Sequence, residues 1–303
     1  MQGNINYPQN RPVNAPPRRP THYAPRRRKK RRRGCFLPAL IILLCITGVT
    51  AVVLHMKGSK SSKAEVTAPS DAASLVTQQP AQAGYELQTA PPYTVALDAG
   101  HGGIDIGAEG IINEVEMTEA TVSALYDLLD ADPNYTPVLC REIGDGMSIG
   151  GRVEAATNAK ASLLLSIHGN SDFSSDTYGF ECFATPPGRT YYSQSLSFAH
   201  SVATQFSTAG AKMRGESGVR YAYYVGTDET GYEKEIAEES DTSVREDLSF
   251  GVLEKPYCPA LLVEQCFVTN SSDVSSWGTS DGCKAAAQLY YNAICEYFGT
   301  VRQ

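Results

Sequence analysis

Six short apolar runs, separated by amphipathic stretches, are the feature that most constrains the fold of this chain. They lie at 93–98, 136–141, 161–168, 179–184, 219–225 and 259–267. Short runs of this composition are typical of buried strands. Helical patterns lie between them, at 117–132, 151–161, 192–210 and 280–299. Strands that alternate with helices predict an α/β domain with a mostly parallel sheet and helices on both faces.

Charge divides the chain into an arm and a body of opposite sign. The chain has 26 basic and 33 acidic residues, and residues 1–34 hold 11 of the basic ones and none of the acidic ones. This stretch is rich in Pro and Arg and cannot bury a core, which predicts a disordered arm at 1–33. The remainder therefore carries 15 basic and 33 acidic residues.

An uncharged apolar segment follows the arm. Residues 34–54 are 21 positions without a charge, and a helix of that length spans a hydrocarbon core of about 30 Å. We therefore predict a transmembrane anchor at 34–55. Basic residues before such a segment stay on the cytoplasmic side. We therefore expect a single-pass membrane protein with its N-terminus in the cytoplasm and its body outside it.

Two alternatives exist for this N-terminal region. A cleaved signal peptide has an apolar region of only about 7–15 residues, which is shorter than the segment here. The run RRRKKRRR, taken alone, is also typical of nucleic-acid binding, but the apolar segment that follows argues against a nucleic-acid partner. Residues 56–91 are rich in Ser, Ala, Gln and Pro and predict a flexible linker. Residues 92–302 form the predicted globular domain.

The cysteines do not predict a thiolate metal site, because the chain contains no CxxC pair. Four cysteines lie in apolar, strand-like runs, where small buried hydrophobic residues are expected: Cys140, Cys182, Cys258 and Cys266. The spacing alone predicts no disulfide pairing.

Three titratable residues follow or end predicted strands. His101 follows the first run, His168 ends the third, and Glu264 lies near the end of the last. In open α/β sheets the working residues gather outside the carboxyl ends of the strands. We therefore expect these three side chains to lie near one another.

Two histidines and a glutamate are a ligand set that catalytic zinc sites use. Glu114 or Glu116, at the start of the 117–132 helix, is the candidate third ligand beside His101 and His168. Glu264 stands in an otherwise apolar strand, where burial raises a carboxyl pKa. It is predicted to act as a general base or, alternatively, to pair with Arg141 or Arg152 for structural reasons. His200 is expected to be a partly buried helix residue.

Three motifs in this order resemble those of the zinc-dependent N-acetylmuramoyl-L-alanine amidases of the Amidase_3 type. They are LDAGHGGIDIGAEG, REIGDGMSIGGRVEAATNAKASLLLSIHGNS and PALLVEQCFVTN, and the resemblance covers about residues 93–298. It implies a single α/β domain with a twisted, mostly parallel six-stranded sheet, here preceded by a transmembrane helix. It also implies hydrolysis of the amide that joins N-acetylmuramic acid to L-alanine in peptidoglycan.

Carried onto this chain, the resemblance makes His101, Glu114 and His168 the ligands of one Zn²⁺ ion and Glu264 the catalytic carboxylate. Asn170 is expected to contact substrate. Arg141, Arg152 and Asn158 are expected to support the site. The family usually has Pro at positions 99 and 106, which are Ala99 and Ile106 here, and Gly where Cys266 stands. Cys266 is therefore expected to narrow the floor of the active-site pocket or to tilt Glu264.

Alternatives of function and of regulation remain at this stage. The chain could be another extracytoplasmic zinc hydrolase, a peptidase or a deacetylase, or a non-catalytic wall-binding regulator on the same scaffold. Residues 227–247 hold nine acidic and two basic residues. They are predicted to form a solvated surface excursion or, alternatively, a lid or regulatory helix over the cleft. The oligomeric state is not predicted.

Overall fold

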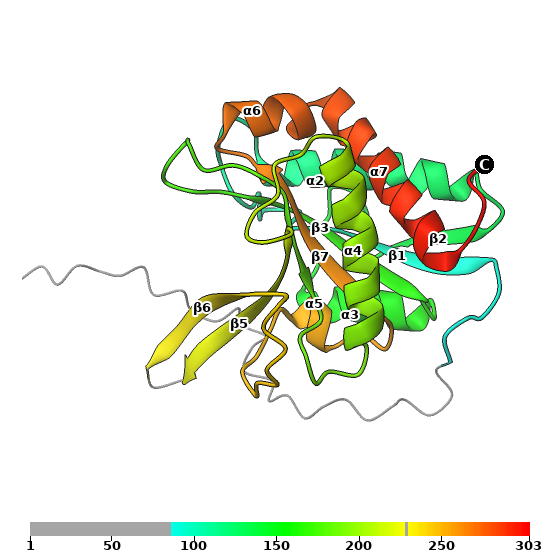
Figure 1. Cartoon of the computed structure of the whole chain (residues 1–303). Coiled ribbons are helices and arrows are strands. Elements are labelled where there is room, and N and C mark those ends of the chain that lie inside the picture. Colours follow the sequence, from blue (N-terminus) through cyan, green and yellow to red (C-terminus); the bar gives the residue numbers. More distant parts are fainter. Residues whose placement is uncertain (1–85, 228–229) are drawn as a thin grey trace, which may run out of the picture. The chain divides into compact units, whose positions relative to one another are not determined.

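A computed structural model describes residues 86–227 and 230–303 of the chain (Figure 1). Its strands are β1 (Tyr93–Ala99), β2 (Tyr135–Leu139), β3 (Leu163–Asn170), β4 (Glu181–Ala184), β5 (Val219–Thr227), β6 (Gly231–Glu238) and β7 (Ala260–Phe267). Its helices are α2 (Glu114–Asp130), α3 (Ile149–Asn158), α4 (Tyr192–Thr208), α5 (Gly251–Glu254), α6 (Ser271–Asp273), a π-helical turn η1 (Val274–Gly278) and α7 (Ser280–Phe298).

The strands form one sheet in the order β2-β1-β3-β7-β4-β5-β6. The first four are parallel to one another, β4 runs antiparallel to β7, β5 is parallel to β4, and β6 is antiparallel to β5. The sheet is therefore mixed, with four parallel and two antiparallel pairs of neighbouring strands, whereas a mostly parallel sheet was predicted. All six predicted strands are present.

The predicted strand number was wrong, because the sheet has seven strands. The additional strand, β6, lies in the acidic stretch 227–247, which was predicted to be a surface excursion or a regulatory helix. Its residues alternate poorly between apolar and polar, and most of its side chains are exposed or half-buried. Main-chain pairing with β5, from Arg220 with Glu238 to Thr227 with Gly231, places it in the sheet.

Alternate residues of the strands face two different helical layers. Val95, Leu97 and their counterparts in β3 and β7 pack against α2, α4 and α7 in the larger core cluster. Ala96, Leu164 and Leu262 face the other way and pack against α3 and α5. The period of two in a strand produces this division. It also decides where the strand-end residues lie, because His168 and Glu264 share the face of Leu164 and Leu262.

Local signals explain where several helices begin and end. The Ser148 hydroxyl accepts a hydrogen bond of 3.1 Å from the backbone N–H of Gly151 at the start of α3. Thr279 caps α7 in the same way through Gly282. Helix α7 ends at Gly299, whose φ of 67° is the left-handed conformation that glycine adopts readily.

The described residues contain no helix that is both long and apolar enough to cross a membrane. The transmembrane part of the predicted fold therefore has no counterpart in residues 86–227 and 230–303. The predicted arm at 1–33, the anchor at 34–55 and the linker up to residue 85 lie outside the described residues.

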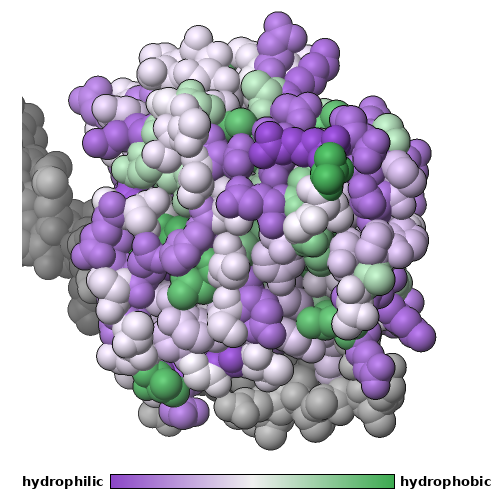
Figure 2. All heavy atoms as spheres, turned by 45° about the vertical axis from the view of Figure 1, so that its right-hand side comes forward, coloured by the Kyte–Doolittle hydropathy of each residue, from purple (hydrophilic) through white to green (hydrophobic). Residues whose placement is uncertain are grey.

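Hydrophilic residues cover most of the face that Figure 2 shows, and hydrophobic residues form small, separate patches on it. Small, scattered patches of this kind are ordinary on a protein surface that faces water. The hydrophobic residues of the strands and helices are mostly inside the two core clusters.

Candidate active site

A glycine-rich loop follows β1 and carries His101 to the end of the sheet. His101 itself has a φ of 61°, a left-handed conformation that is uncommon for a residue with a side chain. The loop lies very close to the other site residues. A Cβ atom at Gly100 would stand 2.5 Å from the ring of His168, and one at Gly107 would stand 2.6 Å from Glu114 and from His101. Glycine at these two positions therefore lets the loop close around the cluster.

His101, Glu114 and His168 come together from three separate parts of the sequence. Glu114 Oε1 lies 3.0 Å from Nε2 of His101 and 3.0 Å from Nδ1 of His168. One candidate ligand atom from each residue lies within 4.8 Å of the others. The two imidazole rings meet edge to face, with centroids 5.1 Å apart. The structure therefore brings the three predicted ligands to one point.

The structure also separates Glu114 from Glu116, which the sequence had left as alternatives. Glu114 is the first residue of α2 and its side chain is buried. The backbone N–H of Ala108 donates to its Oε2 and that of Gly169 to its Oε1, each at 2.9 Å. Glu116 is exposed and accepts a hydrogen bond from Asn113 instead. Glu114 is therefore the carboxylate that faces the two histidines.

The charges of this cluster depend strongly on one another. Burial would raise the pKa of Glu114, but hydrogen bonds from His101 and His168 hold it well below its usual range. Burial lowers the pKa of His101, yet its contacts with Glu114 and Asp105 outweigh this effect and raise it to about 9. Glu114 and the two imidazoles thus share protons, and a cation that binds the same oxygen and nitrogen atoms displaces these protons.

Two aspartates in this region were not identified from the sequence. Asp105 Oδ2 lies 2.9 Å from His101 Nδ1, the ring nitrogen opposite the cluster. A carboxylate in this position fixes the orientation and tautomer of a ligating histidine. Asp98, at the end of β1, is buried and accepts a 2.7 Å hydrogen bond from Ser166. The short loop between His101 and Asp105 was a usable signal for the first aspartate.

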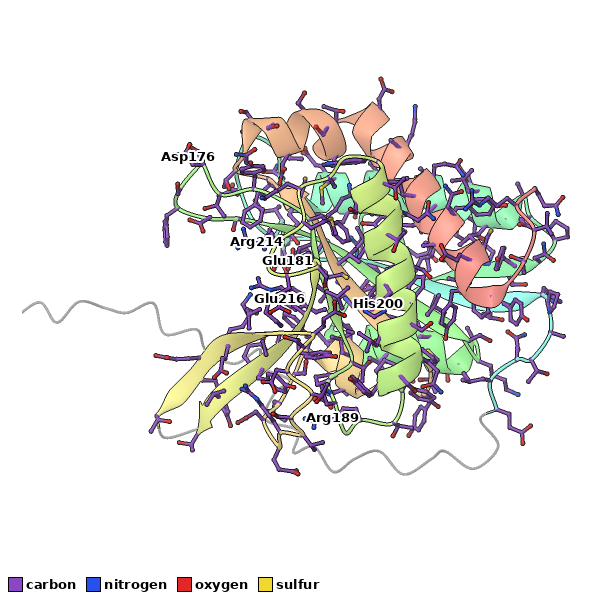
Figure 3. The ribbon with its side chains drawn as sticks, in the orientation of Figure 1. Asp176, Glu181, Arg189, His200, Arg214 and Glu216 are labelled. Carbon is purple, nitrogen blue, oxygen red and sulfur yellow. The ribbon has the colours of Figure 1, made fainter. Side chains whose placement is uncertain are left out.

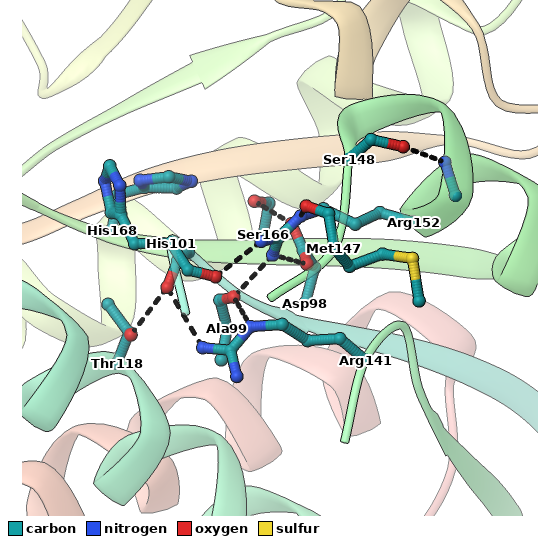
Figure 4. Close-up of polar contacts among 12 residues, drawn as sticks. Asp98, Ala99, His101, Thr118, Arg141, Met147, Ser148, Arg152, Ser166 and His168 are labelled. Atoms are coloured by element: carbon teal, nitrogen blue, oxygen red, sulfur yellow. Dashed lines mark hydrogen bonds and ion pairs between the residues drawn. The ribbon is translucent and has the colours of Figure 1, made fainter. Parts of the chain in front are cut away.

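Arg141 and Arg152 hold the end of β1 in place (Figure 4). Arg141 donates to the carbonyl oxygens of Ala99 and Gly100, at 2.9 and 3.2 Å. Arg152 donates to the Ala99 carbonyl at 2.6 Å, to the His101 carbonyl at 2.5 Å and to Asp98 at 2.6 Å. Both guanidinium groups are buried. They act on the backbone that carries His101, which agrees with the supporting role expected for them.

Glu264 lies beside the cluster on β7, where it is the register partner of His168 on β3. Its predicted structural alternative, an ion pair with Arg141 or Arg152, is not formed. Arg141 pairs with Glu119 and Arg152 with Asp98. Glu264 Oε2 is fully buried and has no hydrogen-bond partner among the described residues. Burial raises the pKa of Glu264 to about 7, against the opposing effect of His168.

A cavity of about 420 Å³ opens beside these residues. His101, His168 and Glu264 line one part of it, and Tyr224, Phe250 and Leu262 line another. A volume of this size is typical of a small-molecule site. The uncommitted carboxylate of Glu264 therefore faces a space that a substrate can enter.

The remaining predicted site residues have other contacts. Asn170 donates a 2.7 Å hydrogen bond to Glu181, which Figure 3 shows beside Arg214, and its predicted contact with substrate stays a prediction. Asn158 is the last residue of α3. His200 is exposed and pairs with Glu239, so the prediction that it is partly buried was wrong.

Cys266 is not among the described residues that line the cavity. Its Sγ lies 3.4 Å from Sδ of Met117, in a small cluster that also contains Cys283. The strand register shifts between His168 and Asn170, where a bulge interrupts the pairing of β3 with β7. This irregularity directs Cys266 towards α2, away from Glu264. The expectation that it narrows the pocket was therefore wrong.

The donor set fits a zinc ion. A tetrahedral zinc ion with ligands at about 2.1 Å places its donor atoms roughly 3.4 Å apart. Ligand atoms that already lie within 4.8 Å of one another reach this arrangement with small shifts. Two imidazoles and one carboxylate leave a further position open, as catalytic zinc sites require.

The sequence of this chain matches the model of a known protein family. The model of the N-acetylmuramoyl-L-alanine amidase family, Amidase_3, matches residues 95–296. A probable N-acetylmuramoyl-L-alanine amidase, AmiB, of Haemophilus influenzae is 28% identical over 233 residues, which are 69% of this chain and 52% of that protein. The N-acetylmuramoyl-L-alanine amidase LytC of Bacillus subtilis is 29% identical over 207 residues, or 68% of this chain and 35% of that protein. The chain thus spans about half or less of these curated relatives.

A solved structure gives the same result for the fold. The catalytic domain of CwlV, an N-acetylmuramoyl-L-alanine amidase from Bacillus (Paenibacillus) polymyxa var. colistinus, aligns with a TM-score of 0.54 and 27% identity. The alignment covers 69% of this chain and 99% of that domain. The family predicted from the sequence motifs is thereby confirmed.

Proposed function

Since the chain belongs to the N-acetylmuramoyl-L-alanine amidase family, we propose that it hydrolyses the amide between N-acetylmuramic acid and L-alanine in peptidoglycan. The observation that carries this proposal is the arrangement of the site. A cluster of two histidines and Glu114 lies beside Glu264, whose Oε2 is buried without a hydrogen-bond partner among the described residues. His101, His168 and Glu264 line one cavity. Metal-assisted cleavage of an unactivated amide combines these two elements, a bound cation and a base.

We assign His101, Glu114 and His168 as the ligands of one zinc ion. A zinc ion bound there supplies Lewis-acid polarisation of the amide carbonyl and makes a nearby water more acidic. The protein prepares for this cation through the contacts of its ligands. Asp105 orients His101, and two backbone N–H groups hold Glu114.

Glu264 is the proton carrier in this proposal. Its carboxyl group has a pKa of about 7 because of burial, and this value suits a group that both accepts and donates a proton near neutral pH. As a carboxylate it takes a proton from the attacking water. It then gives this proton to the nitrogen of the leaving alanine, so that the amine departs neutral.

We also propose that the domain acts outside the cytoplasm, because its proposed partner, peptidoglycan, lies there. Cleavage of the domain by a protease added to intact spheroplasts tests this location. Protection until the spheroplasts are lysed would contradict it.

The central experiment compares the purified wild-type chain with Glu264→Gln. We expect the wild type to release stem peptides with a free N-terminal alanine from peptidoglycan. Glu264→Gln should keep its zinc, measured by atomic absorption, and lose turnover by about 1,000-fold or more. Release of fragments cut within the stem, or of acetate, would instead identify a peptidase or a deacetylase. Zinc retention without any release by the wild type would indicate a non-catalytic wall-binding protein.

A further inference from the structure

The cavity is lined by more residues than the catalytic groups, and one part of its lining has a different chemistry. We call this part the aromatic chamber and define it by Tyr224, Leu248, Phe250, Val252 and Leu262, all of which line the cavity. These residues come from β5, from α5 and the segment before it, and from β7. Activation of a water molecule by Glu264 needs no such apolar space. The apolar residues of the chamber therefore need a separate function.

Tyr224 provides the one phenol in the wall of the chamber. Its side chain is buried, with 8% of the residue exposed. Its backbone N–H donates to the Leu248 carbonyl at 2.7 Å, but its hydroxyl group has no hydrogen-bond partner among the described residues. Buried tyrosine hydroxyls usually have a partner. The Tyr224 hydroxyl therefore stands ready to bind a polar group of a molecule that enters the cavity.

Phe250 presents an aromatic ring in the same chamber. It meets Tyr224 edge to face, with ring centroids 5.9 Å apart, and meets Phe183 in the same way at 5.4 Å. Packing against two rings holds Phe250 in one orientation. Lys234 Nζ lies 5.8 Å from the centroid of the Phe250 ring, over one part of it. The side chain of Phe250 is only half-buried, so the rest of the ring is available to a ligand.

The charges that line the cavity are compatible with a neutral ligand. Four carboxylates line it, Asp98, Asp105, Glu254 and Glu264, against two basic side chains, Arg152 and Lys255. Asp98 pairs with Arg152 and Glu254 pairs with Arg189, so these two carboxylates are neutralised within the wall. The sugar part of the proposed substrate is neutral, because the lactyl carboxyl group is part of the amide.

The wall of the chamber is held in place before any ligand arrives. Arg189 contacts both carboxylate oxygens of Glu254, at 3.2 and 3.1 Å, and donates to the backbone carbonyls of Arg245 and Asp247 at 2.5 and 2.7 Å. Figure 3 shows Arg189 in the loop that leads into α4. A preorganised wall lowers the entropic cost of binding.

We propose that the aromatic chamber is a sugar subsite, in which a neutral N-acetylated hexosamine packs on Phe250 and accepts or donates a hydrogen bond at the Tyr224 hydroxyl. A pyranose ring has a C–H face that packs on aromatic rings and hydroxyl groups at its rim, and the chamber offers both kinds of contact. The proposal rests on the proposed amidase activity. It adds that the glycan side of the substrate occupies the chamber, so that the stem peptide leaves the site on the other side of Glu264.

The test compares two soluble substrates that share the scissile amide. One is a muramoyl peptide, and the other is the corresponding lactoyl peptide, which lacks the sugar. We expect the wild type to favour the muramoyl peptide. In Tyr224→Phe, which removes only the hydroxyl group, this preference in kcat/KM should fall about fivefold, mainly through KM. Phe250→Leu should reduce the same preference by a similar factor.

Tyr126→Phe is the matched control, because Tyr126 lies in α2 and packs against the core on the opposite face of the sheet. It should keep the wild-type preference. Equal cleavage of both substrates by the wild type, or an unchanged preference in Tyr224→Phe and Phe250→Leu, would overturn the sugar subsite and leave the amidase activity intact.

A binding measurement tests the chamber without hydrolysis. The probe is the neutral methylamide of N-acetylmuramic acid, titrated into zinc-loaded Glu264→Gln and followed by NMR. Binding that weakens about fivefold when Tyr224→Phe is added supports the subsite. Absence of binding would contradict it, whatever the outcome of the peptidoglycan assay.

Discussion

The loop that carries His101 and the segment 245–255 line the same cavity, yet they are held there by different means. Arg141 and Arg152 bind the carbonyl oxygens of residues 99–101 directly, and glycines let the loop close on Glu114. The segment 245–255 is held by ion pairs with distant elements. Arg189 pairs with Glu254, and Arg245 with Glu235 of β6.

The two kinds of support match two different functions of these regions. The loop must place ligand atoms within a few tenths of an ångström of the positions that a cation requires, and many short hydrogen bonds to a buried backbone achieve this. The segment 245–255 must offer a wall to a larger molecule, and a few side-chain clamps are enough. We expect changes in the loop to affect metal and fold, and changes in the clamps to affect substrate binding.

The largest effect is expected from His168→Ala. Loss of one of three ligands should weaken zinc binding by at least about 100-fold and remove activity with it. His200→Ala is the control, because His200 is exposed on α4 and pairs only with Glu239. Zinc titration with a competing chelator measures the difference. Equal zinc affinity in the two variants would contradict the assignment of the ligands.

The second largest effect is expected from Arg152→Ala. It leaves the buried carboxylate of Asp98 without its cation and frees the carbonyls of Ala99 and His101. The expected loss of unfolding free energy is about 3–5 kcal/mol, together with weaker zinc binding. Urea unfolding measures the first and chelator competition the second. A stable variant with wild-type zinc affinity would show that the loop does not need this support.

The pH dependence of apo-protein stability isolates Glu264. The pKa of Glu264 in the folded protein is about 7, above the ordinary value of 4.5 for a glutamate. The folded state therefore binds this proton more tightly, and the resulting stability is complete below pH 4.5 and lost as the pH rises through 7. Relative to Glu264→Gln, the metal-free wild type should lose up to about 3 kcal/mol over this range. Parallel stability curves for the two proteins would show that the carboxyl group titrates normally.

Arg189→Ala should loosen the wall of the aromatic chamber and leave the metal cluster unchanged. We expect a rise in KM of roughly 10-fold for muramoyl peptides, with wild-type zinc affinity. Arg189→Lys should recover only part of this effect, because Arg189 contacts two carboxylate oxygens and two carbonyls. A loss of zinc in Arg189→Ala would mean that the two regions are not independent.

The smallest effect on catalysis is expected from Cys266→Ala. Cys266 packs against Met117 and not in the cavity, so the change should remove about 1 kcal/mol of stability through lost packing. Its kcat/KM should stay within about twofold of the wild type, because Glu264 keeps its environment. A large kinetic effect would return Cys266 to the role that the sequence had suggested for it.

The sequence predicted the loop region better than the opposite wall for a physical reason. Strand ends with buried apolar runs locate His101, His168 and Glu264, since period-two burial and parallel pairing act locally. Glu114 needed the glycine loop to fold back, and the resemblance of the motifs supplied that choice. No local pattern marks β6, because its charged residues enter the sheet through main-chain pairing with β5. The role of Arg189 was also hidden, because its partner Glu254 is 65 residues away.

The six described cysteines are all buried and unbridged. The domain therefore reaches its folded state without an oxidant or a disulfide isomerase, and its stability does not depend on the redox potential around it. Burial raises the pKa of the Cys140, Cys182 and Cys266 thiols, which keeps the reactive thiolate form scarce. Burial of this kind shields the thiols of the described domain from oxidants in the surrounding solvent.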